Sequence, residues 1–416
     1  MANEDNKNIK LRVEDLTLIF GKRKKEALAM LNKGVSKEEI LRKTKCTVGI
    51  NKANFEVYEG EIFVVMGLSG SGKSTLIRCL NRLNEPTAGK VFFKDHNITR
   101  AGNKELMNTR RNEMSMVFQN FGLLPHRTIL DNATFGLELR GDSKEARYER
   151  GMEVLERVGL KGYEEHYPGA MSGGMQQRVG LARALANDTD VLLMDEAFSA
   201  LDPLIKSDMQ DELLQIQNEL HKTIVFITHD LDEAFKIGDR IAIMKDGVIE
   251  QIGTAEEILS NPASDYIKAF IEKVDRKTVI TAETLMFRKP TIIQLGKDGP
   301  KGAIRKMRST GQYVLPVENS ERKFLGYVEL TDVIQLARDK ERTVEKALQT
   351  EVPCIHREYT VEEMIPLISE NSYPLAVVDR KSGRLHGLVT QTSIVIEATR
   401  YDDEEVSELI EKANEI

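Results

Sequence analysis

Short apolar runs alternate with helical patterns between residues 11 and 262. Residues 11–20 predict a first strand, and three later runs are almost uninterrupted: Ile62 to Met66, Val191 to Met194 and Thr223 to Ile227. Continuous apolar runs are typical of central parallel strands, because helices cover both faces of such a sheet. The alternation of strands and helices therefore predicts an α/β fold.

Residues 22–45 interrupt this order with a basic segment. Apolar residues at helical spacing (Ala27, Met30 and Leu31) come first, and Ser36 then starts a capping-box pattern. We therefore predict a short helical pair inserted before the core resumes. Two interpretations stay open for it: a decoration of the fold, or a contact to a membrane partner.

From about residue 278 a weak internal repeat appears. Tyr313 to Val317 precedes Gly326, and Tyr373 to Val377 precedes Gly387. Each copy reads as helix, strand, strand, helix, which predicts two similar α+β modules packed together. The predicted domain plan is a nucleotide-binding domain (1–262), a linker (263–277), a tandem regulatory module (278–400) and an acidic tail (401–416).

Composition narrows the class of protein. The chain has 416 residues and a formal net charge of −7, and Tyr401 to Ile416 holds seven acids against one lysine. A dedicated nucleic-acid binder usually carries a basic excess, so no nucleic-acid partner is expected. The three cysteines are far apart, which fits a reducing cytoplasm better than a disulfide framework.

No targeting or membrane segment is evident. The first ten residues are polar, and no stretch approaches the roughly 20 apolar residues that span a bilayer. A role at a membrane would therefore need other subunits to hold this chain there.

The segment from Gly67 to Ser74 matches G-x-x-x-x-G-K-S, between a buried strand and a helical pattern. Backbone N–H groups of such a loop curl around phosphate oxygens, and the helix directs its positive end at them. Lys73 supplies a charge to the β- and γ-phosphates, and the Ser74 hydroxyl is a Mg²⁺ ligand. The predicted ATP-binding residues here are Gly67, Ser69, Gly70, Ser71, Gly72, Lys73, Ser74 and Thr75.

A second apolar strand ends in two carboxylates, Asp195 and Glu196. Asp195 is predicted to hold Mg²⁺, and Glu196 to orient or deprotonate the attacking water as general base. Together the two motifs indicate a P-loop nucleotide hydrolase without naming its class.

The class comes from Met171 to Arg178, which resembles the signature of ABC ATPases, Leu-Ser-Gly-Gly-Gln. Met171 and Met175 depart from that pattern, whereas Ser172, Gly173 and Gly174 match it. Ser172 also fits as the cap of a helix whose N-terminus faces an anion. The resemblance implies that Ser172, Gly173, Gly174 and Gln176 serve an ATP held by a second copy of the chain.

Further family motifs follow in order over residues 11–262. The resemblance implies that Phe20 stacks on adenine, although a core aromatic is the alternative. It implies that Gln119 senses Mg²⁺ and contacts the transport subunit, that Asp202 lies in the dimer-interface loop, and that His229 contacts the γ-phosphate.

Within the ABC ATPases, the chain resembles the ATPase subunits of glycine betaine/proline-type osmolyte importers. The basic insertion at 22–45 and the methionine after Ser-Gly-Gly support this. The resemblance implies integral permease subunits as partners and a peripheral location on the cytoplasmic face of the membrane. The solute does not touch this subunit, so its identity rests on the resemblance.

Residues 278–400 resemble a tandem pair of CBS modules. Adenosine-binding CBS modules often end in Gly-x-x-Thr-x-x-Asp, but Glu329 replaces the Thr in the first repeat and Ser393 replaces the Asp in the second. Simple AMP sensing is therefore disfavoured. Related importers suggest cyclic di-AMP as a ligand, or ionic-strength gating against anionic lipid through a basic surface: Lys297, Lys301, Arg305, Lys306 and Arg308. An ordinary solvated helix face is the alternative.

Two other hypotheses remain at this point. A soluble, non-transport ABC ATPase acting in translation or DNA repair generally carries two cassettes or a long coiled-coil insertion, neither of which is present. Alternatively, the CBS pair is an inert dimerisation module.

Overall fold

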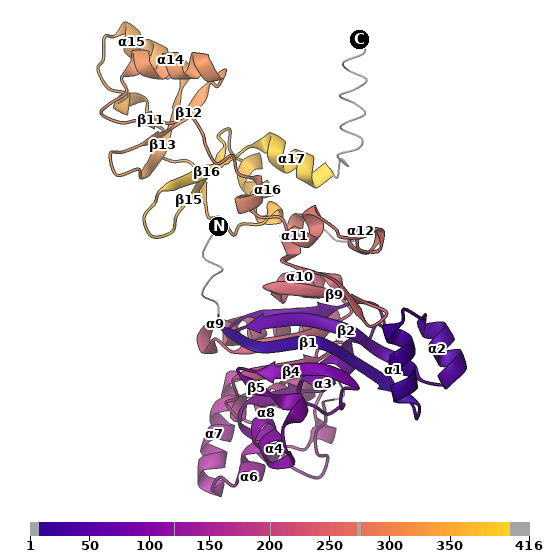
Figure 1. The fold of residues 1–416 in the computed structure, drawn as a ribbon. Coiled ribbons are helices and arrows are strands. Elements are labelled where there is room, and N and C mark those ends of the chain that lie inside the picture. Colours follow the sequence, from indigo (N-terminus) through magenta and orange to yellow (C-terminus); the bar gives the residue numbers. More distant parts are fainter. Residues whose placement is uncertain (1–7, 120, 200, 273–275, 400–416) are drawn as a thin grey trace. The chain divides into compact units, whose positions relative to one another are not determined.

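The computed structural model describes residues 8–119, 121–199, 201–272 and 276–399. The chain divides into two compact units, an N-terminal unit (Met1–Val274) and a C-terminal unit (Asp275–Ile416). The acidic tail predicted at 401–416 lies outside the described residues. Figure 1 follows each unit along the chain by colour.

A six-stranded sheet forms the centre of the N-terminal unit, with its strands in the order β10-β9-β3-β8-β7-β6. The strands are β3 (Ile62–Met66), β6 (Met114–Val117), β7 (Val191–Asp195), β8 (Thr223–Thr228), β9 (Arg240–Lys245) and β10 (Val248–Gly253). The three predicted apolar runs are confirmed as β3, β7 and β8, which are parallel neighbours buried over their whole length. Only β10 is antiparallel, as the return of a hairpin with β9.

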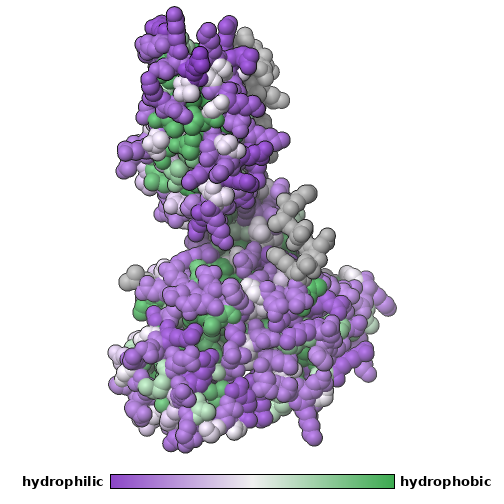
Figure 2. Space-filling view, turned by 90° about the vertical axis from the view of Figure 1, so that its left-hand side faces the viewer, coloured by the Kyte–Doolittle hydropathy of each residue, from purple (hydrophilic) through white to green (hydrophobic). Residues whose placement is uncertain are grey.

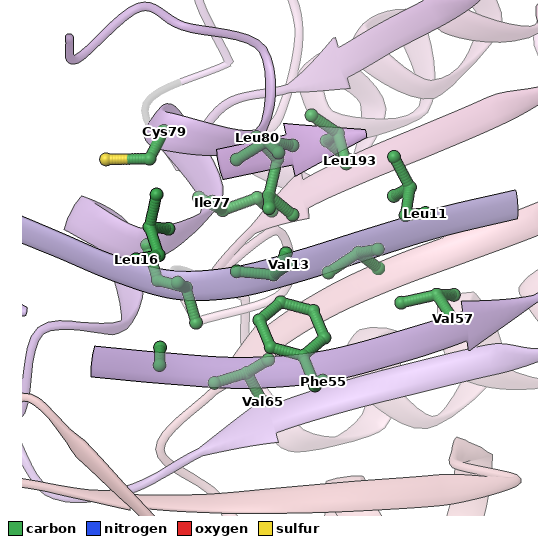
Figure 3. Close-up of a cluster of buried hydrophobic side chains, with 14 of the residues drawn as sticks. Leu11, Val13, Leu16, Phe55, Val57, Val65, Ile77, Cys79, Leu80 and Leu193 are labelled. Atoms are coloured by element: carbon green, nitrogen blue, oxygen red, sulfur yellow. The ribbon is translucent and has the colours of Figure 1, made fainter. Parts of the chain in front are cut away.

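An antiparallel sheet of order β2-β1-β4-β5 packs against it. Its strands are β1 (Ile9–Phe20), β2 (Thr47–Tyr58), β4 (Ala88–Phe93) and β5 (His96–Asn97). Figure 3 shows the core between the sheets, where Val13 of β1 and Phe55 of β2 lie with Val65 of β3 and Ile77 of α3 (Lys73–Leu80). Because β1 and β2 are anchored here, Phe20 at the end of β1 has a fixed place relative to α3.

Helices complete the N-terminal unit. Four of them, α5 to α8, pack on one another as a helical group. The α-helices of this unit that follow α3 are α4 (Asn103–Asn112), α5 (Ile129–Ala133), α6 (Phe135–Arg140), α7 (Lys144–Arg157), α8 (Gly173–Ala186), α9 (Pro203–Leu220), α10 (Leu231–Ile237), α11 (Ala255–Ser260) and α12 (Asp265–Ile271).

The predicted helical pair is confirmed as α1 (Lys24–Asn32) and α2 (Lys37–Thr44). Ser36 caps α2, because its side chain accepts a hydrogen bond from the Glu39 N–H. The pair has a small core of its own, in which Ala27 and Ile40 pack against Ile19 of β1.

The C-terminal unit contains two copies of one arrangement. The first has α13 (Ala282–Leu285), β11 (Ile293–Gln294), α14 (Pro300–Thr310), β12 (Val314–Glu318), β13 (Phe324–Glu329) and α15 (Leu330–Arg338). The second has β14 (Cys354–Ile355), α16 (Val361–Ser369), β15 (Leu375–Val378), β16 (Leu385–Val389) and α17 (Gln391–Thr399). The predicted order of helix, strand, strand, helix is therefore present twice.

Tyrosines join the two copies. The Tyr327 and Tyr373 rings stack with centroids 5.4 Å apart. The Tyr327 hydroxyl donates to the Pro374 carbonyl at 2.8 Å, and the Tyr373 hydroxyl donates to Glu329 at 2.5 Å. The Glu329 hydrogen bond, with partial burial, raises the pKa of Tyr373 to about 12.

Most of the face seen in Figure 2 is hydrophilic, with hydrophobic residues gathered in small patches. Within residues 8–399, apart from positions 120, 200 and 273–275, no helix has the length and apolar character needed to cross a membrane.

Candidate functional site

The phosphate loop (Gly67 to Ser74) joins β3 to α3, as its sequence context predicted. Gly67 has φ +152°, and a Cβ there would lie 2.1 Å from the Met244 carbonyl oxygen. Gly72 has φ +104°, and a Cβ there would lie 2.5 Å from the Gly49 carbonyl oxygen. Only glycine fits at these two positions, because a side chain would collide with the neighbouring backbone. The loop can therefore lie close to the backbone behind it, and its outer side is left for phosphate.

Lys73 lies inside this loop with 4% of its surface exposed. Its Nζ donates to the carbonyl oxygens of Gly67 at 2.8 Å and Leu68 at 3.2 Å, and it lies 3.8 Å from the Glu196 carboxylate. Burial lowers the pKa of the Lys73 ammonium. The charge is thus held in the centre of the loop, where phosphate oxygens would replace the carbonyls as its partners.

Two carboxylates end β7 in different surroundings. Asp195 is fully buried, and its Oδ2 accepts a 3.0 Å hydrogen bond from Arg78 of α3. Its other oxygen, Oδ1, is buried without a partner. The sequence reasoning missed Arg78; the available signal was a basic residue on the helix that follows the phosphate loop.

Glu196 has a left-handed backbone conformation, with φ +47°. For a residue other than glycine this costs about 1–3 kcal/mol, and such strain is often found at functional sites. The carboxylate accepts a 3.0 Å hydrogen bond from the Gln119 amide, and it lies 3.6 Å from the His229 Nδ1. The structure thus brings together the three residues predicted as catalytic.

A Mg²⁺ site was predicted at Ser74, Gln119 and Asp195. Mg²⁺ prefers oxygen ligands, most often one or two carboxylates. The buried Oδ1 of Asp195, which has no partner among the described residues, is such an oxygen. The hydroxyl of Ser71, in the phosphate loop, is also buried without a described partner. The residues present therefore fit a divalent cation next to the phosphate loop.

Phe20 has 43% of its surface exposed at the end of β1. Gly49 lies under the ring: a Cβ at Gly49 would be 3.0 Å from the Phe20 Cε2 and 3.4 Å from the Thr75 Cγ2. An exposed aromatic face beside the first turn of α3 suits a base attached to phosphates in the loop.

The signature segment (Ser172 to Gln176) begins α8. The Ser172 side chain caps the helix by accepting from the Met175 N–H at 3.3 Å, and Ser172 and Gly173 are exposed. Gly174 is buried against Ile205. Gln176 instead donates to the carbonyl oxygens of Pro168 and Met171, both at 3.1 Å, so its amide supports the preceding loop.

The hydrogen bonds and ion pairs of Glu196 with other described residues involve Lys73, Gln119, Ser199, Ile227 and His229, and none of the signature segment. Asp202 caps α9, accepting from the Ile205 N–H at 3.1 Å. The predicted residues therefore form two groups in one chain, a phosphate-loop group and a signature group.

A separate surface hollow of about 430 Å³ is lined by α4 and the end of α6 and contains no residue of either group. Its lining is Asn103, Lys104, Met107, Asn108, Arg111, Asn112 and Arg140.

Comparison with known families gives two matches. The ABC transporter family matches residues 50–199, and the CBS domain family matches residues 344–398.

Whole-length relatives are similar throughout. The glycine betaine/carnitine transport ATP-binding protein GbuA of Listeria monocytogenes is 50% identical, over 93% of this chain and 96% of its own length. The glycine betaine transport ATP-binding protein OpuAA of Bacillus subtilis is also 50% identical, over 94% and 93%. The glycine betaine/proline betaine transport system ATP-binding protein ProV of Salmonella typhimurium is 45% identical, over 90% and 94%.

Among solved structures, the dimeric bacterial ABC transporter cassette MJ0796 aligns with a TM-score of 0.51 and 31% identity, covering 59% of this chain and 98% of that one. Its dimeric post-hydrolysis state bound to ADP and Pi aligns with a TM-score of 0.50.

Proposed function

The chain belongs to the ATP-binding subunits of ABC transporters, and on this basis we propose that it powers the import of a glycine betaine-like solute, with Glu196 as the general base of hydrolysis. The contacts of Glu196 support this assignment most directly. Its carboxylate lies 3.8 Å from Lys73 in the phosphate loop and accepts a hydrogen bond from Gln119. A base held beside the phosphate loop is within reach of a water molecule that attacks the terminal phosphate.

Hydrolysis needs the phosphates fixed and the water oriented. Lys73 and the N–H groups at the start of α3 bind the phosphates, because their charge and dipole point into the loop. Glu196 accepts the proton of the attacking water, while Gln119 and His229 both lie beside its Oε2 and orient the carboxylate. Phe20 orients the adenine ring of ATP by stacking on it.

Mg²⁺ neutralises charge on the phosphates when it is bound. The Asp195 carboxylate, the Ser74 hydroxyl and the Gln119 amide would hold it, with Arg78 orienting Asp195 through the 3.0 Å hydrogen bond to Oδ2.

The active unit we propose is a dimer of this chain. None of the described contacts of Ser172, Gly173 and Gly174 reaches the phosphate loop of their own chain, and Ser172 and Gly173 are exposed at a helix N-terminus. That exposed end suits the terminal phosphate of an ATP on a second copy. Gln176 takes a supporting role, because its amide is engaged with Pro168 and Met171.

The solute follows from the relatives, whose names include glycine betaine, carnitine and proline betaine. Integral permease subunits would form the path and hold this chain at the cytoplasmic face of the membrane. The test is reconstitution with the permease subunits in proteoliposomes, followed by ATP-dependent uptake of labelled glycine betaine, proline betaine, carnitine, choline and a neutral amino acid. Preferential uptake of betaines is expected; a stable soluble dimer that binds no permease would contradict the transport role.

We also propose that the C-terminal unit regulates this activity. Neither repeat has a complete AMP pattern. In the first, Glu329 stands in place of the Thr and accepts a hydrogen bond from the Tyr373 hydroxyl; in the second, Ser393 stands in place of the Asp and is hydrogen-bonded with Thr390. The basic surface on α14 is smaller than the sequence suggested, because Lys306 pairs with Asp298 at 2.6 Å. Lys297, on the loop before α14, and Lys301, Arg305 and Arg308 of α14 are exposed and remain available to anionic lipid.

Salt and nucleotide distinguish the two forms of regulation. Attraction between exposed charges and lipid weakens over a Debye length of about 8 Å at physiological salt. Activation by internal salt that requires anionic lipid, and is lost in a Lys301→Gln/Arg305→Gln variant, supports lipid gating. Inhibition by cyclic di-AMP at constant salt supports ligand gating. A chain lacking residues 278–416 with unchanged responses would contradict both.

A further inference from the structure

Lys206, in the first turn of α9, joins this helix to the loop that carries His229. Its Nζ lies 2.6 Å from the Asp230 carboxylate and 3.5 Å from the Glu233 carboxylate. The Lys206 side chain is 18% exposed and that of Glu233 only 4%. The Asp230 side chain is 38% exposed, so the sheltered pair is Lys206 with Glu233, which is less screened than a pair on an open surface.

The two carboxylates are tied to the backbone on both sides of His229. The Asp230 N–H donates to the Thr228 hydroxyl at 2.9 Å, and the Thr228 hydroxyl donates to Glu233. Gln210, one turn further along α9, donates to Glu233 at 3.2 Å. Burial by itself would raise the pKa of Asp230, but Lys206 and the nearby backbone N–H groups hold that pKa below its usual value. His229 is thus placed by a network anchored on α9.

Ile205, the residue before Lys206, contacts the signature group. A Cβ at Gly174 would lie 2.8 Å from the Ile205 Cγ2, so Ile205 packs directly against the signature segment. The same turn is capped by Asp202. Consecutive residues of one helical turn therefore contact the signature segment and the His229 loop.

We propose that Lys206 is a positioning residue for His229, and that the first turn of α9 links this histidine to the signature segment of the same chain. The proposal rests on the dimer described above, in which the signature segment faces the ATP of the second copy. ATP at that segment moves α8 against Ile205, and the rigid turn carries the shift through Lys206 to Asp230 and His229. Hydrolysis in one site then depends on occupancy of the other.

A purely structural role is the competing explanation, and the chain offers a matched control. Lys236 of α10 pairs with Asp211 of α9 at 2.8 Å, so it joins the same two helices. Lys236 lies at the far end of α10 from His229. Lys236 also donates to the Ser207 hydroxyl at 3.3 Å, so its loss removes one charge pair and one hydrogen bond between these helices and leaves the network at His229 in place.

The test uses the full chain assembled with its permease. Wild-type hydrolysis is measured first, because its absence would contradict the ATPase assignment and not the coupling alone. Lys206→Met is expected to leave the Kd for ATP within about twofold, lower kcat about tenfold, and bring the Hill coefficient for ATP from above 1 to about 1. Lys206→Arg is expected to restore both quantities in large part, and Lys236→Met to match the wild type.

Three results would overturn the proposal. One is a wild-type Hill coefficient of 1. Another is a Lys206→Met complex that keeps the wild-type Hill coefficient, whatever its kcat. The third is a Lys236→Met complex that loses kcat and cooperativity to the same extent as Lys206→Met. If Lys206→Met fails to fold, the Asp230→Asn chain serves in its place with the same expected loss.

Discussion

The Gln119 amide donates a 3.0 Å hydrogen bond to the Glu196 carboxylate, across 77 residues of sequence. Gln119 follows β6 and Glu196 follows β7, and these strands are parallel neighbours. Their carboxyl ends therefore bring the proposed metal-sensing amide and the proposed general base to one edge of the sheet. This contact makes the geometry of Glu196 depend on a residue expected to bind Mg²⁺ and to face the transport subunit.

Gln119→Ala is expected to weaken both functions of that residue. Half-saturation by Mg²⁺ should rise several-fold and kcat should fall about tenfold, because a ligand and an orienting hydrogen bond are lost. A Mg²⁺ titration of ATP hydrolysis measures both. An unchanged Mg²⁺ dependence would remove Gln119 from the metal site.

The glycines of the phosphate loop are expected to differ in tolerance. Gly67→Ala should abolish ATP binding, because its Cβ would lie 2.1 Å from the Met244 carbonyl oxygen. Gly70→Ala is the matched control: it also has a positive φ, +82°, but no atom lies within 4 Å of its added Cβ. Its cost is the backbone conformation alone, about 1–2 kcal/mol.

Equilibrium binding of a fluorescent ATP analogue distinguishes the two glycine variants. Equal losses at Gly67 and Gly70 would mean that backbone conformation, and not the contact with Met244, limits substitution.

Phe20→Ala is expected to raise the Kd for ATP at least about fivefold, since stacking of a base on an aromatic ring contributes about 1–3 kcal/mol by alanine substitution. Phe20→Tyr keeps the ring and should bind normally. Wild-type affinity in Phe20→Ala would assign the ring to packing against Gly49 and Thr75.

Sequence reasoning located the phosphate loop, the carboxylates of β7 and the cap Ser172 because each lies in a contiguous motif with its own local structure. It did not find Arg78 beside Asp195 or Lys206 beside Asp230, because these pairs form only when separate elements pack. It also placed Lys306 in a basic surface. In the structure Lys306 forms an ion pair with Asp298, which lies on the loop before α14. Motifs thus identify reacting groups, and tertiary packing decides what holds them.

Tyr373→Phe is expected to destabilise the C-terminal unit by about 1–2 kcal/mol, because the hydroxyl donates to the charged Glu329. The corresponding fall in melting temperature is about 3–6 °C for a unit of this size. Tyr313→Phe is the control, since Tyr313 has the equivalent position in the first repeat and is 75% exposed.

Calorimetry of the full chain measures both tyrosine variants. The raised pKa of Tyr373 makes this stabilisation depend on pH. The contribution of the hydroxyl to the free energy of unfolding is complete below the unfolded-state pKa of about 10 and is lost as pH rises towards about 12. Equal melting temperatures for Tyr373→Phe and the wild type would contradict a stabilising bond between the repeats.

The central claim is that ATP hydrolysis, with Glu196 as the general base, drives solute import. Paired measurements on Glu196→Gln test it most directly. Wild-type and variant chains are assembled with the permease in proteoliposomes that contain ATP and Mg²⁺, and uptake of labelled glycine betaine is followed together with phosphate release. The variant should bind ATP like the wild type while uptake and phosphate release both fall at least about a hundredfold. Near-normal hydrolysis or uptake by Glu196→Gln would contradict the account.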